Sequence, residues 1–196
     1  DFQLDLIINS YCLDDIKFEN NDIVIDCGAN VGELNLALNK GDADLKYYAF
    51  EPDEETFESL KLNNPKNIDT LFKLGLSNES KKMNFFLDTE GGNSSIVDFG
   101  SKNVVEIQTS TLDSMQINKK IKLFKVEAEG YEPEVLEGAE STLRLIEYVS
   151  VDFGPERGED SENTVIQVNN ILTKAGFELV KFSNYRVIGL YRNKSI

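Results

Sequence analysis

The sequence predicts one α/β domain over residues 1–196, in which a seven-stranded, mostly parallel sheet carries helices on both faces and ends in an antiparallel hairpin. Short apolar runs alternate with amphipathic stretches along the chain, a rhythm typical of parallel strands joined by crossover helices. A chain of 196 residues suits a single core. Only 13 Gly and 4 Pro occur, which favours a packed chain over a disordered one.

The first half of the chain is predicted to alternate helix and strand. Asp53 can cap a helix, because an aspartate side chain accepts N–H bonds from the first helical turn, and Pro65 stops it. An N-terminal helical segment covers residues 1 to about 20. The expected elements are a helix at 3–16, a strand starting at 23–25, a glycine-containing turn at 27–32, a helix around 34–38, a strand at 45–50, a helix at 53–63 and a third strand at 68–76.

The second half departs from this rhythm and then resumes it. Short segments around a turn at 91–93 are expected to form hairpin or edge strands, and Gly176 stops the last helix. The expected elements are strands at 83–87, 95–97 and 104–109, a core strand at 121–126, a helix at 134–143, a fifth core strand at 148–153, a polar loop at 154–163, a helix at 164–175, and strands at 177–182 and 186–192 paired around 183–184.

Composition excludes several classes of chemistry. The chain has no His and two Cys, so a Ser-His-Asp triad, a Cys-His pair and the usual His or Cys₄ zinc sites are absent. Asp and Glu number 35 against 20 Lys and Arg, which argues against a nucleic-acid partner. A carboxylate is the expected general base. No apolar run approaches the roughly 18 residues of a membrane span, so we expect a cytoplasmic protein with no membrane partner.

A glycine-containing turn follows the first predicted strand, at Asp26-Cys27-Gly28-Ala29-Asn30-Val31-Gly32. Ligands of open α/β sheets bind beyond the carboxyl ends of such strands. Gly28 would permit a tight turn and a close approach of ligand to backbone, and Gly32 would open the next helix, whose N–H groups attract an anion. Asp26 stands where a dinucleotide site has its first glycine. A carboxylate there suits the sulfonium and amino group of S-adenosylmethionine better than a pyrophosphate, so a nucleotide-dependent oxidoreductase is disfavoured.

The second strand ends in Glu51, 23 residues after Gly28. An acid at this place can accept both ribose hydroxyls of a nucleoside. We therefore predict a cofactor site that includes Asp26, Gly28, Gly32 and Glu51. The alternative is that both glycines only permit close packing, that Asn30 is a turn residue, and that Glu51 caps the next helix.

Together these motifs resemble the FkbM family of S-adenosylmethionine-dependent methyltransferases. The resemblance extends over residues 20–192, and the stretch 125–139 is its most specific part. Glu127 stands where the family usually has Asp, in a Lys-Ile-Asp-Val-Glu-Gly pattern. The segments that carry the resemblance are 26–32, Phe50-Glu51-Pro52, Gly92-Asn93-Ser94-Ser95, Thr111-Leu112-Asp113, 125–132, 135–139 and 151–158.

The resemblance implies a Rossmann-like class I methyltransferase fold and transfer of a methyl group to a hydroxyl of a small molecule, such as a sugar or a secondary metabolite. The cofactor would be S-adenosyl-L-methionine, and the resemblance implies that it is bound by Asp26, Gly28, Asn30, Gly32 and Glu51. A sequence pI near 4.4 favours a neutral or cationic acceptor over a polyanion. The competing hypothesis is a non-catalytic cofactor-binding or interaction module with the same fold.

Candidate catalytic residues follow the strand at 121–126. Glu127 and Glu129 are two residues apart, so in an extended chain they would point the same way, and either is a candidate base for the acceptor hydroxyl. Tyr131 is a candidate for orienting the acceptor. The carboxylates could equally share a hard cation, cap the next helix, or form salt bridges. The salt-bridge partners considered are Lys125, Arg144 and Arg157.

Overall fold

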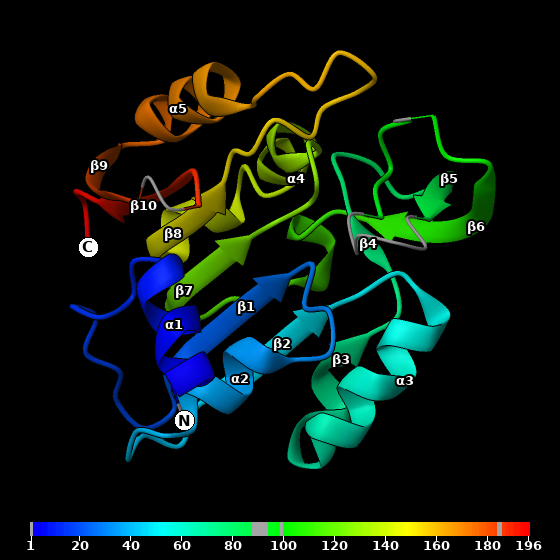
Figure 1. The fold of residues 1–196 in the computed structure, drawn as a ribbon. Coiled ribbons are helices and arrows are strands. Elements are labelled where there is room, and N and C mark those ends of the chain that lie inside the picture. The colour runs from blue at the N-terminus through cyan, green and yellow to red at the C-terminus, as the bar shows by residue number, and fades with distance from the viewer. Residues whose placement is uncertain (1, 88–93, 99, 184–185) are drawn as a thin grey trace.

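The computed structural model describes residues 2–87, 94–98, 100–183 and 186–196 (Figure 1). The predicted turn at 91–93 and residue 184 of the C-terminal turn lie outside these ranges. The helices are α1 (Phe2–Ser10), α2 (Glu33–Leu38), α3 (Glu54–Asn63), α4 (Glu132–Glu137) and α5 (Val165–Lys174), with 3₁₀ turns η1 (Pro65–Thr70), η2 (Asp113–Met115) and η3 (Thr142–Leu145).

The main sheet has the predicted seven strands, in the order β3-β2-β1-β7-β8-β10-β9. The first five of these strands pair in parallel, and β10 is antiparallel to both β8 and β9. The predicted C-terminal hairpin is therefore confirmed. The strands are β1 (Ile23–Cys27), β2 (Lys46–Phe50), β3 (Leu71–Phe72), β7 (Ile121–Val126), β8 (Ile146–Asp152), β9 (Phe177–Ser183) and β10 (Ile188–Asn193).

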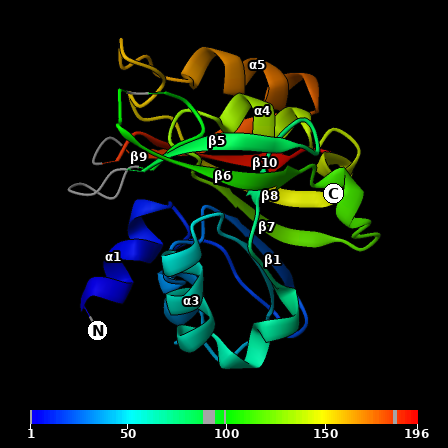
Figure 2. The ribbon, with the colours of Figure 1, turned by 90° about the vertical axis from the view of Figure 1, so that its right-hand side faces the viewer.

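Helices cover both faces of this sheet, with α4 and α5 on one side and α1 and α3 on the other (Figure 2). Alternation along β1 separates the two cores. Ile23 and Ile25 pack in the cluster that includes side chains of α4 and α5, whereas Val24 packs with side chains of α2 and α3. Because successive strand residues point to opposite faces, Asp26 lies on the same face as Val24.

Three predicted elements are corrected by the structure. The first helix ends at Ser10, because Cys12 adopts a left-handed φ of 61°. The third strand is much shorter than 68–76, since the segment after Pro65 forms a 3₁₀ turn and only Leu71–Phe72 joins the main sheet. The fourth helix starts earlier than 134 and ends at Glu137; Pro133 fits the first helical turn, where its missing N–H has no partner to lose.

A second, smaller sheet is inserted between β3 and β7. It has the order β4-β6-β5, with β4 at Gly75–Leu76, β5 at Lys82–Leu87 and β6 at Asn103–Ser110. The predicted 95–97 strand reduces to a single bridge between Ser95 and Phe86. Of the helices in the described ranges, none is long and apolar enough to cross a membrane.

Candidate active site

A cavity of about 790 Å³ opens beyond the carboxyl ends of β1, β2 and β7. The strand ends are level, because Cys27 pairs with both Phe50 of β2 and Val126 of β7. Phe85 of the inserted sheet and Ile96, between β5 and β6, contribute to one wall. The cavity therefore lies at the point where the chain order of the sheet reverses, which is where open α/β sheets bind ligands.

The turn after β1 is held against the neighbouring strands. The N–H groups of Gly28 and Ala29 both donate to the carbonyl oxygen of Phe50, at 3.1 Å. Gly28 has a φ of 71°, and a Cβ there would lie 2.0 Å from the Glu127 carbonyl oxygen. Glycine is thus required because the turn contacts the end of β7, and Gly28 also lines the cavity.

The other two predicted residues of the turn, Asn30 and Gly32, differ in their relation to the cavity. Asn30 lines the cavity, with a left-handed φ of 48°. Gly32 precedes α2 with a φ of 87°, and a Cβ there would lie 2.1 Å from Asn64 Nδ2. Gly32 is not among the described residues that line the cavity. The structure therefore gives Gly32 a packing role and keeps Asn30 in the candidate cofactor site.

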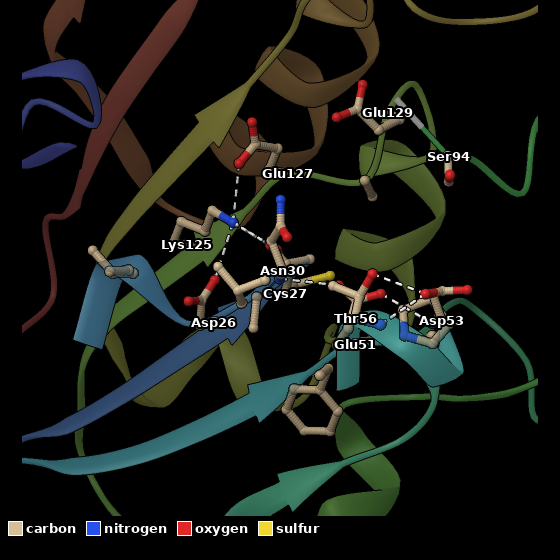
Figure 3. Close-up of a pocket in the computed structure, with 18 of the residues that line it drawn as sticks. Asp26, Cys27, Asn30, Glu51, Asp53, Thr56, Ser94, Lys125, Glu127 and Glu129 are labelled. Atoms are coloured by element: carbon tan, nitrogen blue, oxygen red, sulfur yellow. Dashed lines mark hydrogen bonds and ion pairs between the residues drawn. The ribbon is translucent and has the colours of Figure 1, made fainter. Parts of the chain in front are cut away.

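Glu51 lies in the cavity wall, only 7% exposed. The N–H of Asn30 donates to one carboxylate oxygen at 2.9 Å and that of Asp53 to the other at 3.0 Å (Figure 3). Burial raises the pKa of Glu51 to about 7, although these two N–H groups lower it. Asp53, not Glu51, caps α3, through Thr56 N, so the capping alternative for Glu51 is wrong.

Lys125 lies at the centre of the site. This lysine is 2% exposed, and its ammonium lies 3.0 Å from Asp26 Oδ1 and 3.1 Å from Glu127 Oε2 (Figure 3). It also donates to the carbonyl oxygens of Cys27 and Gly28, at 3.2 and 2.6 Å. The ammonium thus ties the turn after β1 to the residue that follows β7.

Asp26 is consequently not the free negative charge that the motif predicts. Its other carboxylate oxygen accepts the Tyr47 hydroxyl at 2.5 Å, and the side chain is 1% exposed. Burial raises the pKa of Asp26, and Lys125 opposes that rise. The negative charge of Asp26 is therefore paired with the Lys125 ammonium at the cavity wall.

Glu127 is saturated with partners. Lys125, the Tyr11 hydroxyl and the Arg186 guanidinium all contact its carboxylate. Burial acts to raise the pKa of Glu127, but Lys125 and then Arg186 outweigh it and hold the pKa below the usual range. Of the three predicted salt-bridge partners, Lys125 is the one that pairs with Glu127; Arg157 pairs with Glu134 at 2.6 Å.

Glu129 has the opposite environment. The chain leaves the extended conformation here, with a φ of 48° at Glu129 and 91° at Gly130, yet Glu127 and Glu129 both line the cavity. Burial, then Glu156 and Glu127, raise the pKa of Glu129 to about 9. No described group hydrogen-bonds to its buried Oε2.

Tyr131 is not brought to the cavity. It precedes α4, and its hydroxyl lies 3.9 Å from the sulfur of Met83. The structure instead adds Tyr11 and Arg186, which line the cavity from opposite ends of the chain. In the described part of the chain, no group of His, Cys, Asp and Glu is arranged to hold a metal ion.

The sheet order, the turn after β1 and the acid after β2 together define the class: a Rossmann-like class I methyltransferase fold. A protein of Aquifex aeolicus, described as a SAM dependent methyltransferase, has this fold. It superposes with a TM-score of 0.53 and 14% identity, over 96% of this chain and 88% of that one.

Within that class, the chain belongs to the FkbM methyltransferase family, whose domain matches residues 26–179. This confirms the resemblance in the motifs. The FkbM methyltransferase of Methylobacillus flagellatus KT superposes with a TM-score of 0.63 and 17% identity, over 91% of this chain and 45% of that one. Hexuronic acid methyltransferase AglP of Haloferax volcanii is 29% identical over 139 residues, which are 69% of this chain and 57% of that protein. The chain thus spans little more than half the length of that relative.

Proposed function

We propose that the protein is an S-adenosylmethionine-dependent O-methyltransferase that acts on a hydroxyl of a small molecule such as a sugar. The observation that carries the proposal is Glu51, a buried carboxylate in the wall of a large cavity at the switch point of a methyltransferase fold. Its two oxygens each accept one backbone N–H, and a carboxylate has further lone pairs for ribose hydroxyls.

The donor set fits this cofactor. S-adenosylmethionine supplies a methyl group on a sulfonium and carries a net positive charge. Glu51 would hold the ribose, while Asn30 and the neighbouring turn would border the methionine part. Seven carboxylates and two cations line the cavity in the described ranges, an excess that suits a cation. The carboxylates are Asp26, Glu33, Glu51, Asp53, Glu55, Glu127 and Glu129.

Two carboxylates with separated pKa values indicate a division of roles. Glu127 stays ionised and holds Tyr11, Lys125 and Arg186 in place, so it has little capacity left to accept a proton. Glu129 has an oxygen without a partner and a pKa raised to about 9. Glu129 is therefore the group that we assign to receive the proton of the acceptor hydroxyl. The cavity wall from the inserted sheet would exclude water from the transfer.

The direct test is a labelled-methyl transfer assay over a panel of hydroxylated small molecules, with cofactor binding measured by calorimetry. Transfer to an acceptor oxygen is the expected result. Cofactor binding without transfer to any acceptor would favour the non-catalytic module instead. Absence of cofactor binding would contradict the site as a whole.

Replacing Glu51 by Gln is expected to weaken cofactor binding about 100-fold, because charge-assisted bonds to two hydroxyls are lost and one backbone N–H faces an amide N–H₂. Calorimetric titration of the folded variant measures this. Glu58, an exposed residue of α3 paired with Lys61, provides the control as Glu58→Gln, which should bind normally. Equal affinities for both variants would remove Glu51 from the site.

Cofactor affinity should also depend on pH. Since the pKa of Glu51 is raised to about 7, the carboxylate is protonated below this pH and loses its attraction for a cation. The dissociation constant is therefore expected to rise about tenfold for each pH unit below 7, and to level off above it. Glu51→Gln should flatten this dependence. A dependence that persists in the variant would assign it to another group, such as Glu132, whose pKa is also raised to about 7.

A further inference from the structure

Each cation in the described lining of the cavity is already held by carboxylates of the chain itself. Lys125 is engaged by Asp26 and Glu127, at 3.0 and 3.1 Å. The same ammonium donates to two backbone carbonyl oxygens, so its N–H donors are all committed. Figure 3 shows it enclosed between the two carboxylates.

Arg186 is likewise engaged. Its guanidinium contacts Glu127 and lies 3.4 Å from Asp152 Oδ2. Both contacts are made by Nη2, and the arginine side chain is 41% exposed. Releasing Arg186 to a ligand would leave Glu127 with one cation fewer in a position that is 15% exposed.

No other lysine or arginine belongs to the described lining. The residues outside the described ranges, 1, 88–93, 99 and 184–185, include neither Lys nor Arg. A negatively charged acceptor would therefore meet only cations that are already paired with carboxylates, and it would enter beside the ionised Glu127. Like charges in such a position cost binding energy, which acts as a selection against anions.

From these contacts we infer the acceptor class: a hydroxylated small molecule with neither carboxylate nor phosphate, so that acidic sugars are rejected. The inference rests on the proposed function and narrows it. It also separates this chain from the hexuronic acid methyltransferase to which it is similar. The selection would be made by Glu127, acting through the two cations that it neutralises.

Glucose and glucuronic acid form the matched pair for the test, because they differ at the carbon-6 group, which is a carboxylate at pH 7 in glucuronic acid alone. Methyl transfer to each is measured at saturating S-adenosylmethionine, and binding of each to the cofactor-loaded protein is measured by calorimetry. We expect kcat/KM to be about 100-fold lower for glucuronate. Raising the salt concentration from about 0.05 M to about 0.5 M should narrow this ratio, since salt screens charge repulsion.

Glu127→Gln adds a test of the cause. It removes one negative charge and leaves Arg186 and Lys125 with one carboxylate each, so discrimination against glucuronate should fall at least tenfold. Glu147→Gln is the matched control, since Glu147 also bridges two lysines, at 2.9 and 3.1 Å, but outside the cavity. Discrimination should be unchanged in this control.

The outcomes separate the two proposals. Glucuronate used or bound as well as glucose overturns the acceptor class, while any transfer still supports the proposed function. Binding that prefers glucose, without transfer, supports the acceptor class and contradicts the proposed function. Binding of neither sugar overturns the acceptor class. If Glu127→Gln does not fold, the wild-type ratio and its salt dependence still decide.

Discussion

Replacing Lys125 by Met is expected to lower the free energy of unfolding by about 3–5 kcal/mol, because it leaves Asp26 and Glu127 buried without the ammonium between them. Asp26 is 1% exposed, so water cannot replace the lost charge. This is a large part of the roughly 5–15 kcal/mol that stabilises a typical domain. Urea denaturation at pH 8 measures the loss.

The same experiment has a pH signature. Without Lys125, the pKa values of both carboxylates rise above their values in the unfolded chain. The two ionised carboxylates then lower the free energy of unfolding more as pH rises and less as pH falls toward 5. The difference in free energy of unfolding between wild type and variant should therefore be smaller in acid. Lys82→Met is the control, since Lys82 pairs with Glu106 and both side chains are exposed, so it should change stability by about 1 kcal/mol or less. A loss of the same size from Lys125→Met would mean that Tyr47, Tyr11 and Arg186 suffice to hold the carboxylates.

Methyl transfer is expected to accelerate with rising pH, with a midpoint near 9, because Glu129 must lose its proton before it can accept one from the acceptor. Its raised pKa of about 9 leaves only a small ionised fraction at pH 7. Glu129→Gln should lower kcat about 10²–10⁴-fold, the usual contribution of a general base. Cofactor affinity, measured by calorimetry, should change little.

Glu156→Gln tests the origin of that pKa. It removes a charge that raises the pKa of Glu129, so the midpoint of the pH profile should move below 9. Burial is the larger cause of the shift and remains in the variant, so the pKa of Glu129 stays above that of an ordinary glutamate. Glu159→Gln, an exposed change in the same loop, should leave the profile in place. If the pH profile of methyl transfer is unchanged in both Glu129→Gln and Glu156→Gln, proton transfer is assigned to water or to another group.

Short-range patterns of apolar residues, helix caps and turn residues predict much of the fold. The buried strands β1, β2, β7 and β8 follow from short, mostly apolar runs, and the cap of α3 follows from Asp53. The glycine turn and Glu51 follow from spacing along one βαβ unit. The third strand is mispredicted because its apolar residues are interrupted by polar ones and follow Pro65, which starts a 3₁₀ turn.

The partners of Glu127 could not be predicted in this way. Tyr11 lies 116 residues away and Arg186 lies 59 residues away along the chain, and no periodicity relates residues at such distances. Lys125 did carry a signal, since a lysine within the apolar strand Ile121–Val126 must find a buried partner. Its pairing with Asp26 is the point at which the predicted charge of the cofactor turn needed correction.

The convergence of Tyr11 and Arg186 on one carboxylate has a consequence for biosynthesis. A ribosome delivers the turn after β1 and Glu127 well before it delivers Arg186. The nascent polypeptide therefore holds an incomplete charge network until the hairpin of β9 and β10 packs beside β8. We expect competence for methylation to arise only after β10 has paired with β8.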